Sequence, residues 1–267
     1  MNKIHTVFTP RGGSGKTTLI SNLSSILATK YKKKILIIDS DPKGDISITF
    51  GKNPYEFENT TWDVMVKGLD PRAAIVSLRE NIDLLPANDD MNFLEFDILP
   101  HLDKYTRPYH LLKDGMASIE NNYDYIFIDT PPSLGFVAWN CLTYTNQVII
   151  PFVPEIYDVQ GVTRVIKAIN EFKNDYNPRL SMASILGMKV ETNTTLHSQM
   201  LEEARIYSRE NEIHMYDSVI PKSISFAKSI AYNSTPAILN SKTNTKITEP
   251  YKKIAKQFLN TELKASL

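Results

Sequence analysis

The sequence predicts an α/β fold in which a doubly wound, mostly parallel sheet carries helices on both faces. Short β-branched runs alternate along the chain with longer stretches of helical period, which is the order that builds a parallel sheet. Several short runs are apolar throughout, as strands are when a sheet is buried on both sides. The expected strands cover residues 4–9, 34–39, 82–86, 125–129, 148–153, 185–190 and 215–220.

Helices are expected between these strands, over residues 16–29, 109–120, 159–176, 196–210 and 250–263. Within the third of them, apolar residues recur at spacings of three and four and form one stripe that faces the sheet. The chain shows no internal repeat and no evident linker, so we expect residues 1–267 to form a single domain. The irregular pattern over residues 51–99 is where we expect an insertion or an effector surface.

The composition excludes several classes of protein. The 267 residues include 30 lysines and arginines against 30 aspartates and glutamates, so a globally basic coat protein and an acidic tail are excluded. Cys141 is the only cysteine, which excludes an internal disulfide, a cysteine-rich zinc site and an iron–sulfur cluster within one chain. The five histidines are scattered without metal-ligand spacing. We expect a cytoplasmic location, because the N-terminus lacks the pattern of a secretion signal.

The uncharged stretch over residues 130–154 is the nearest approach to a membrane span. A bilayer helix needs about 20 mostly apolar residues in a row, whereas Pro131, Pro132, Gly135 and Pro151 interrupt this stretch. We therefore expect buried strands and turns here.

The first expected strand runs directly into a glycine-rich loop and then a helix. The loop reads Pro10-Arg11-Gly12-Gly13-Ser14-Gly15-Lys16-Thr17-Thr18. Glycines allow backbone N–H groups to approach a polyphosphate closely, and the helix N-terminus adds its dipole. Lys16 is expected to reach the β and γ phosphates and the Thr17 hydroxyl to bind Mg²⁺. A glycine-rich turn that only joins strand to helix would not require lysine followed by threonine.

The loop departs from the usual P-loop NTPase pattern, because Pro10 occupies the position of its first glycine. The segment from Arg11 to Thr17 instead resembles the deviant Walker A motif of the ParA/MinD family, whose extra basic residue is usually lysine. The resemblance implies that Arg11 crosses the interface of an ATP-sandwich homodimer to contact the partner's phosphates. Arginine retains the charge and adds forked donors that suit phosphate oxygens. The alternative is a solvated arginine beside the loop.

The second expected strand ends in Asp39-Ser40-Asp41-Pro42-Lys43-Gly44-Asp45. A carboxylate at this edge, beside a phosphate loop, can orient water or hold Mg²⁺ through water. The segment is similar to the family's Asp-x-Asp-Pro-Gln-Gly-Asn, which implies that Asp41 orients the attacking water. Lys43 and Asp45 depart from the usual glutamine and asparagine. Capping of a turn explains Asp39 and Asp45 equally well and is also an alternative for Asp41.

A third strand ends in Asp129, followed by Thr130-Pro131-Pro132. A metal that bridges phosphates needs hard oxygen ligands, so we interpret Asp129 as the Walker B carboxylate in the Mg²⁺ shell near Thr17. The three residues that follow resemble the family's switch segment, a candidate sensor of the γ-phosphate.

Adenine is the expected base, because the sequence contains no Asn/Thr-Lys-x-Asp segment of the kind that reads guanine. In the resembling family the adenine lies near the ends of two late strands. These positions correspond here to Met188, Lys189, Pro221 and Lys222, although core packing also explains Met188. The expected cofactors are therefore ATP and Mg²⁺.

The resemblance covers nearly the whole chain and is strongest to short ParA-type DNA partition ATPases. It implies that ATP closes a dimer that binds DNA without sequence preference on the nucleoid. A ParB-like centromere-binding protein would then stimulate hydrolysis and release. Such binding needs a local basic face, for which the candidates are Lys222, Lys228, Arg205 and Arg209. A solvated surface charge is an equally good interpretation of each.

Three alternatives remain open. A MinD-type membrane ATPase would end in a basic amphipathic helix, and an apolar stripe occurs near the C-terminus among Lys252, Lys253 and Lys256. We expect no membrane binding, because Glu249 and Glu262 flank that stripe and one stripe more often packs in a core. A bacterial tyrosine kinase would carry a C-terminal tyrosine cluster, which is missing. A nucleotide-gated scaffold with little hydrolysis would retain the phosphate loop without needing Asp41.

Overall fold

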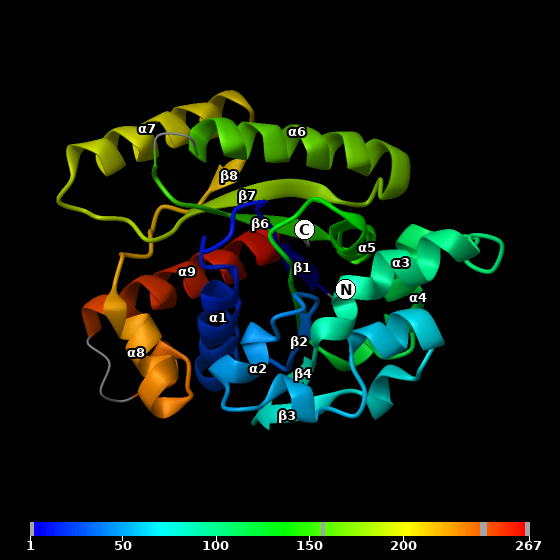
Figure 1. Cartoon of the computed structure of the whole chain (residues 1–267). Helices are drawn as coiled ribbons and strands as arrows, with labels where there is room; N and C mark the ends of the chain where they lie inside the picture. Colours follow the sequence, from blue (N-terminus) through cyan, green and yellow to red (C-terminus); the bar gives the residue numbers. More distant parts are fainter. Residues whose placement is uncertain (1–2, 156–157, 241–244, 265–267) are drawn as a thin grey trace.

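An eight-stranded sheet runs through the centre of the computed structural model, which describes residues 3–155, 158–240 and 245–264 (Figure 1). The strands follow the order β3-β4-β2-β5-β1-β6-β7-β8. Neighbouring strands are parallel except β3 and β4, which pair antiparallel with a register shift between Ser77 and Arg79. The strands are β1 Lys3–Val7, β2 Ile35–Asp39, β3 Val76–Arg79, β4 Ile82–Leu85, β5 Tyr125–Asp129, β6 Gln147–Phe152, β7 Ser181–Gly187 and β8 His214–Met215. The predicted doubly wound, mostly parallel sheet is confirmed.

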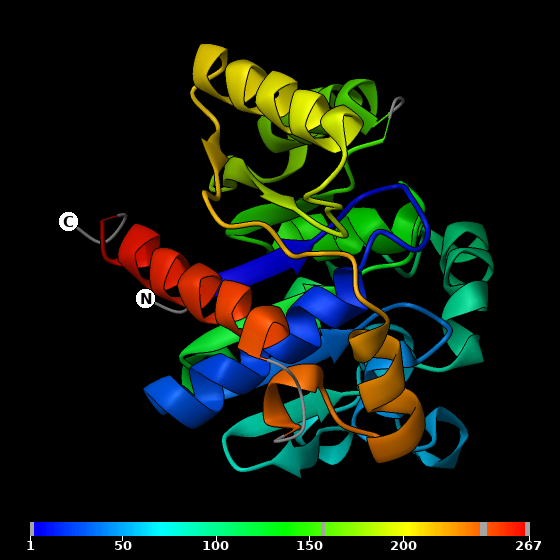
Figure 2. The same ribbon diagram turned by 90° about the vertical axis from the view of Figure 1, so that its left-hand side faces the viewer.

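Helices cover both faces of this sheet, as the two views show (Figures 1 and 2). On one face α1 (Lys16–Tyr31) packs beside α9 (Thr245–Lys264), with α8 (Ile224–Asn233) next to them. The opposite face carries α3 (Leu94–Ile98), α4 (Leu111–Met116), α5 (Phe136–Tyr144), α6 (Asp158–Tyr176) and α7 (Thr195–Glu210). The short helix α2 (Asp45–Thr49) follows β2.

Strand β2 shows why the central strands are apolar throughout. Ile35 and Ile37 join the core beneath α1, whereas Leu36 and Ile38 join the core beneath α5. Successive side chains of a strand point to opposite faces, so a sheet with helices on both faces needs apolar residues at every position. Each of these four side chains is fully buried.

The prediction of only strands and turns over residues 130–154 is wrong in part, because α5 lies within this range. Helix α5 packs against two hydrophobic clusters of the same face of the sheet. Cys141 belongs to one of them and Leu142 to the other. Since this helix carries no charged residue, no polar face marks its period in the sequence.

Several other predictions differ from the structure. The strand expected over 185–190 is β7, which covers Ser181–Gly187, and the helix expected over 250–263 begins at Thr245. Helix α4 is shorter than the range 109–120, and 3₁₀ turns at Pro108–His110 and Glu120–Asn122 flank it. Of the strand expected over 215–220, only Met215 belongs to a strand, β8, and an isolated bridge joins Val190 to Pro221 further along the chain. The prediction also misses β3, whose residues are alternately half-buried and exposed at the edge of the sheet.

The apolar stripe of α9 is part of the core. Tyr251, Ile254, Ala255 and Phe258 are at most 1% exposed and pack with the residues of α1. Core packing therefore accounts for this stripe, and it is not available to insert into a membrane. Within the described ranges, no helix is both long enough and apolar enough to cross a bilayer.

Candidate functional site

The carboxyl ends of β1, β5 and β2 are neighbours in the sheet, and the loops that follow them meet there (Figure 1). Residues 8–15 join β1 to α1, residues 40–44 follow β2, and residues 130–135 follow β5. Ligands of open α/β sheets bind in the crevice outside such strand ends. The fold therefore brings Lys16, Asp41 and Asp129 into one place, although 88 or more residues separate Asp129 from the other two in the chain.

The loop before α1 has the backbone of an anion cradle. Gly13 and Gly15 adopt left-handed φ angles of 70° and 95°, which favour glycine. A Cβ atom added at Gly12 or Gly13 would meet no other atom within 4 Å, so a ligand can approach the backbone there. The first turn of α1 begins at Lys16 and directs its unpaired N–H groups toward the same space. The cavity of about 190 Å³ at this point is lined by residues 12–18, Asp41, Lys43, Asp45, Pro132 and Lys189.

Lys16 is a buried cation in a cluster of carboxylates. Its side chain is 7% exposed, and Nζ donates a hydrogen bond of 3.4 Å to the carbonyl oxygen of Arg11. Burial lowers the pKa of Lys16, and the charges of Asp129 and Asp41 oppose that shift. Because Lys16 also lines the cavity, its ammonium group is placed to bind an anion there.

Thr17 and Asp129 form the pair of oxygen donors expected for a metal. Thr17 Oγ1 donates a hydrogen bond of 2.6 Å to Asp129 Oδ2, while the buried Asp129 Oδ1 has no hydrogen-bond partner among the described residues. Burial raises the pKa of Asp129 to about 7, against the hydrogen bond from Thr17 and the charge of Lys16. A buried carboxylate with an unused oxygen fits Mg²⁺, which prefers hard oxygen ligands and retains several waters. The described residues contain no closed cage of three or more His, Cys, Asp or Glu side chains.

The loop after β2 is organised by Asp39, for which the sequence leaves turn capping and a functional role equally open. Its two carboxylate oxygens accept hydrogen bonds from the backbone N–H groups of Asp41 (3.0 Å) and Ile46 (3.3 Å). Asp41 Oδ1 in turn accepts from the N–H of Lys43 at 3.1 Å, and Asp41 Oδ2 makes no hydrogen bond with the described residues. Burial and the nearby Asp129 raise the pKa of Asp39 well above its usual value. The arrangement holds Asp41 at the wall of the phosphate-sized cavity.

We expect Asp129→Asn to stabilise the unliganded protein at pH 8 and to have a smaller effect at pH 5. A carboxylic acid whose folded pKa is about 7 and whose unfolded pKa is near 3.8 binds its proton more tightly in the folded state. Stability is therefore greatest below the unfolded pKa and decreases as the pH rises toward 7, by about 1.4 kcal/mol per unit. The cost of the buried charge therefore grows between pH 5 and 7, and asparagine removes it.

Thermal unfolding of wild type and Asp129→Asn at both pH values measures the effect. Asp103→Asn is the matched control, because Asp103 is exposed and forms no hydrogen bond or ion pair with the described residues. An Asp129→Asn shift of the same size at pH 5 and pH 8 would contradict the expectation.

Arg11 lies beside the glycine loop and forms an ion pair with Glu155 of the same chain. The two side chains are 40% and 53% exposed, and the hydrogen bond from Arg11 lowers the pKa of Glu155. Exposed ion pairs contribute about 1 kcal/mol or less, so the guanidinium can exchange Glu155 for a more strongly charged anion at little cost. The structure of a single chain leaves the cross-dimer role of Arg11 a prediction.

A second cavity, of about 430 Å³, adjoins the glycine loop at Gly15 and Thr18. All four residues predicted to lie near adenine line it: Met188, Lys189, Pro221 and Lys222. Met188 is 1% exposed and belongs to the hydrophobic core as well as to the cavity wall, so its position is compatible with core packing and with a place near adenine. Lys189 Nζ donates to the carbonyl oxygen of Gly13 at 2.5 Å, which ties this cavity to the phosphate loop.

Sequence reasoning does not assign the far wall of this cavity. It is formed by α8 and the residue before it, and it contains Ser223, Ile224, Phe226, Ala227 and Ile230. Ile224, Ala227 and Ile230 are three residues apart in the sequence, a spacing that predicts one apolar face of a helix. The wall is mostly apolar, as expected for a surface that holds a flat aromatic base.

The four candidate DNA-binding residues do not gather on one surface. Arg205 and Arg209 lie on α7, whereas Lys222 and Lys228 lie just before and on α8, and both views show these helices at opposite ends of the molecule (Figures 1 and 2). Arg209 pairs with Glu202 at 3.1 Å and Lys222 with Glu191 at 2.5 Å. Of the four, Lys228 alone has no hydrogen bond or ion pair with the described residues.

A family model described as an AAA domain matches residues 2–182. The sporulation initiation inhibitor protein Soj of Bacillus subtilis (strain 168) is 30% identical over 240 residues, which are 90% of this chain and 91% of Soj. The chromosome partitioning protein ParA of Caulobacter vibrioides (strain NA1000 / CB15N) is 27% identical over 256 residues, which are 94% of this chain and 92% of that protein.

The fold is also similar to that of a solved structure. Cobyrinic acid a,c-diamide synthase from Mycobacterium smegmatis, with a bound ATP analogue and magnesium, superposes with a TM-score of 0.82. The two sequences are 26% identical, and the match covers 97% of this chain and 94% of that one.

Proposed function

This chain belongs to the ParA/Soj family of P-loop proteins with an AAA domain, and from that premise we propose that it is an ATP-dependent DNA partition ATPase. The resemblance stated from the sequence motifs is thereby confirmed at the level of the family. The observation that carries the proposal further is the meeting of the glycine loop, the Thr17–Asp129 pair and Asp41 around one cavity. That combination supports hydrolysis of a nucleoside triphosphate, whereas a scaffold without hydrolysis would not need Asp41.

ATP would lie with its phosphates in the cavity lined by residues 12–18 and its adenine in the apolar cavity against α8. Lys16 and the loop N–H groups would neutralise the β and γ phosphates, which carry the charge that develops during transfer. Thr17, Asp129 and Asp41 would hold Mg²⁺, directly or through water, and the bound ion would neutralise negative charge on the phosphates.

Hydrolysis requires a water molecule in line with the γ-phosphorus and the ADP oxygen that leaves. The unused Oδ2 of Asp41 supports a role for this carboxylate in orienting that water. The new bond joins the water oxygen to the γ-phosphorus, the bond to ADP breaks, and the water proton is released with phosphate.

Arg11→Ala is expected to prevent the ATP-dependent dimer while reducing ATP affinity only a few-fold. We propose that, in the ATP state, Arg11 leaves Glu155 and contacts the phosphates bound by a second copy. The positive guanidinium and the negative phosphate would then attract each other in a partly desolvated contact. Light scattering with ATP and Mg²⁺ distinguishes monomer from dimer, using a hydrolysis-deficient background so that the state persists.

Two further variants make this result specific. Arg11→Lys retains the cation and should restore the dimer, and Arg179→Ala removes an exposed arginine far from the loop and should leave it intact. An Arg11→Ala protein that dimerises with ATP as wild type does would contradict the cross-dimer role.

The complete proposal is tested by DNA binding in three nucleotide states. Fluorescence anisotropy with a duplex of random sequence should show binding with ATP and Mg²⁺ and little with ADP or no nucleotide, and the affinity should decrease steeply with salt. A centromere-binding partner protein would then accelerate ATP turnover and release the DNA. If ATP leaves the DNA affinity unchanged but increases sedimentation with anionic liposomes, partition is the wrong assignment.

A further inference from the structure

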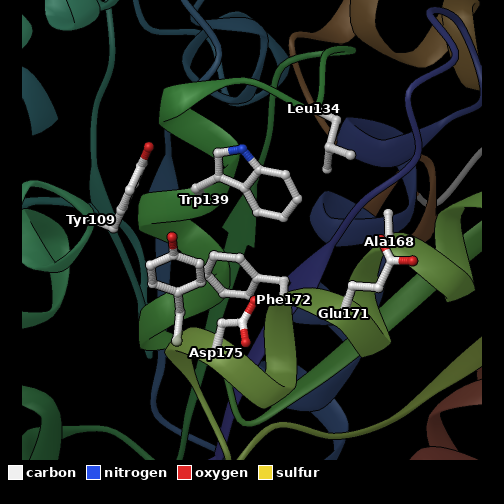
Figure 3. Close-up of a pocket in the computed structure, with 8 residues that line it drawn as sticks. Tyr109, Leu134, Trp139, Ala168, Glu171, Phe172 and Asp175 are labelled. Atoms are coloured by element: carbon white, nitrogen blue, oxygen red, sulfur yellow. The ribbon is translucent and has the colours of Figure 1, made fainter.

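A cavity between α5 and α6 lies outside the nucleotide site and combines aromatic rings with two carboxylates (Figure 3). Its volume is about 360 Å³. Figure 3 shows Trp139 projecting from α5 toward Phe172 of α6, with Glu171 and Asp175 on the same helix as Phe172. The remaining lining residues are Tyr109, Leu134, Ala168 and Tyr176. None of these eight residues lines the phosphate or adenine cavity, so the proposed ATP chemistry makes no use of them.

The rings form a continuous stack that reaches the surface. Trp139 stacks on Phe172 with centroids 4.6 Å apart, and Phe172 stacks on Tyr176 at 5.0 Å. Tyr109 meets Tyr176 edge-on at 5.4 Å. Phe172 is buried between its neighbours, whereas Tyr176 is 45% exposed and Trp139 is half-buried. Aromatic faces carry negative potential and therefore attract cations.

Neither carboxylate of the cavity forms an ion pair with a cation of the described residues. Glu171 and Asp175 are exposed, lie four residues apart on one face of α6, and form no hydrogen bond or ion pair with the described residues. Like charges at this spacing repel each other along a helix. No lysine, arginine or histidine is among the residues that line the cavity, so Glu171 and Asp175 are its only acidic or basic lining residues.

We propose that this cavity binds an arginine side chain presented by a partner polypeptide. A guanidinium group can stack on an aromatic face with its plane and donate forked hydrogen bonds to carboxylates with its edge, and the cavity offers both surfaces. A lysine ammonium is more strongly hydrated and cannot stack in the same way, so it should bind more weakly. An uncharged ligand would leave the repulsion between Glu171 and Asp175 in place. The inference is independent of the proposed ATPase activity, because its residues lie outside that site.

Trp139 itself reports occupancy. The sequence has two tryptophans, so Trp62→Phe leaves Trp139 as the single tryptophan of the full-length chain, which can be excited apart from the tyrosines. The probe is a capped peptide of glycine and serine with one central arginine, and matched peptides carry lysine or glutamine at that position. We expect a saturable change of Trp139 fluorescence with the arginine peptide, weaker binding of the lysine peptide, and none of the glutamine peptide. Calorimetry on the chain with both tryptophans provides a second measurement that does not depend on emission.

Removing the two charges tests the assignment directly. Glu171→Gln combined with Asp175→Asn should weaken arginine-peptide binding at least about tenfold. Glu203→Gln combined with Glu210→Gln removes the same charge from exposed positions of α7 and should leave the affinity within about twofold. Absence of saturable binding by both methods overturns the proposal, as does equal binding of the glutamine peptide or unchanged affinity in the Glu171/Asp175 variant.

Discussion

Lys16→Ala is expected to abolish ATP hydrolysis and to weaken ATP binding at least about a hundredfold. Lys16 is 7% exposed, and its charge interacts with those of Asp129 and Asp41. Without it, the phosphates of ATP would enter a cavity whose remaining buried charges are negative. Removing one partner of a buried, hydrogen-bonded charge pair costs roughly 3–5 kcal/mol, which corresponds to a factor of a hundred or more.

Calorimetric titration with ATP and Mg²⁺ and a phosphate-release assay measure the two losses. Lys30→Ala is the matched control, since it removes the same charge from the exposed end of the same helix and should change neither quantity. The circular dichroism spectrum should match that of the wild type in both variants. Turnover near the wild-type rate in Lys16→Ala would exclude the glycine loop as the catalytic phosphate site.

Asp41→Ala should lower the rate of ATP hydrolysis at least about a hundredfold while ATP affinity changes only a few-fold. A positioned carboxylate that orients or deprotonates water contributes about 10²–10⁴ to the rate. The alanine variant retains Lys16, Thr17 and Asp129 and therefore the main contacts to phosphate and metal. Because its ATP persists, the variant is also expected to accumulate as the closed dimer, visible by light scattering.

A structural role of Asp41 would give a different pattern. Asp41 Oδ1 accepts the N–H of Lys43, so alanine also removes a hydrogen bond that shapes the loop. Asp41→Asn can retain that acceptor but loses the negative charge. Loss of hydrolysis in both variants supports water positioning, whereas recovery of the rate in Asp41→Asn assigns Asp41 to the turn alone.

The central part of the fold can be predicted from the sequence because its physical demands are local. A sheet covered on both faces needs uninterrupted apolar strands, and β2 and β5 satisfy this at every position. The glycine loop is equally local, since left-handed φ angles at Gly13 and Gly15 and the start of α1 fall within four residues. The positions of the two carboxylates can also be predicted, because Asp129 is the last residue of β5 and Asp41 lies two residues after the end of β2.

Other features depend on neighbours that a single segment does not reveal. Helix α5 contributes side chains to two cores and therefore has no polar face, so the sequence shows no alternation of apolar and polar residues with a helical period there. Whether the stripe of α9 faces a core or a lipid surface is decided by α1, which lies more than 200 residues earlier in the chain. The aromatic cavity is assembled from residues 109, 134–139 and 168–176, which no periodic pattern connects.

The borders of the sheet limit how two copies of this chain can meet. One border is the two-residue strand β8, and the other is β3, which runs against its neighbour and shifts register. Neither edge strand offers a long, regular row of unpaired backbone N–H and C=O groups with which a strand of another chain could pair. In the proposed dimer the two copies would therefore meet through loops and helix surfaces, and such contacts can separate without breaking the main-chain pairing of the sheet.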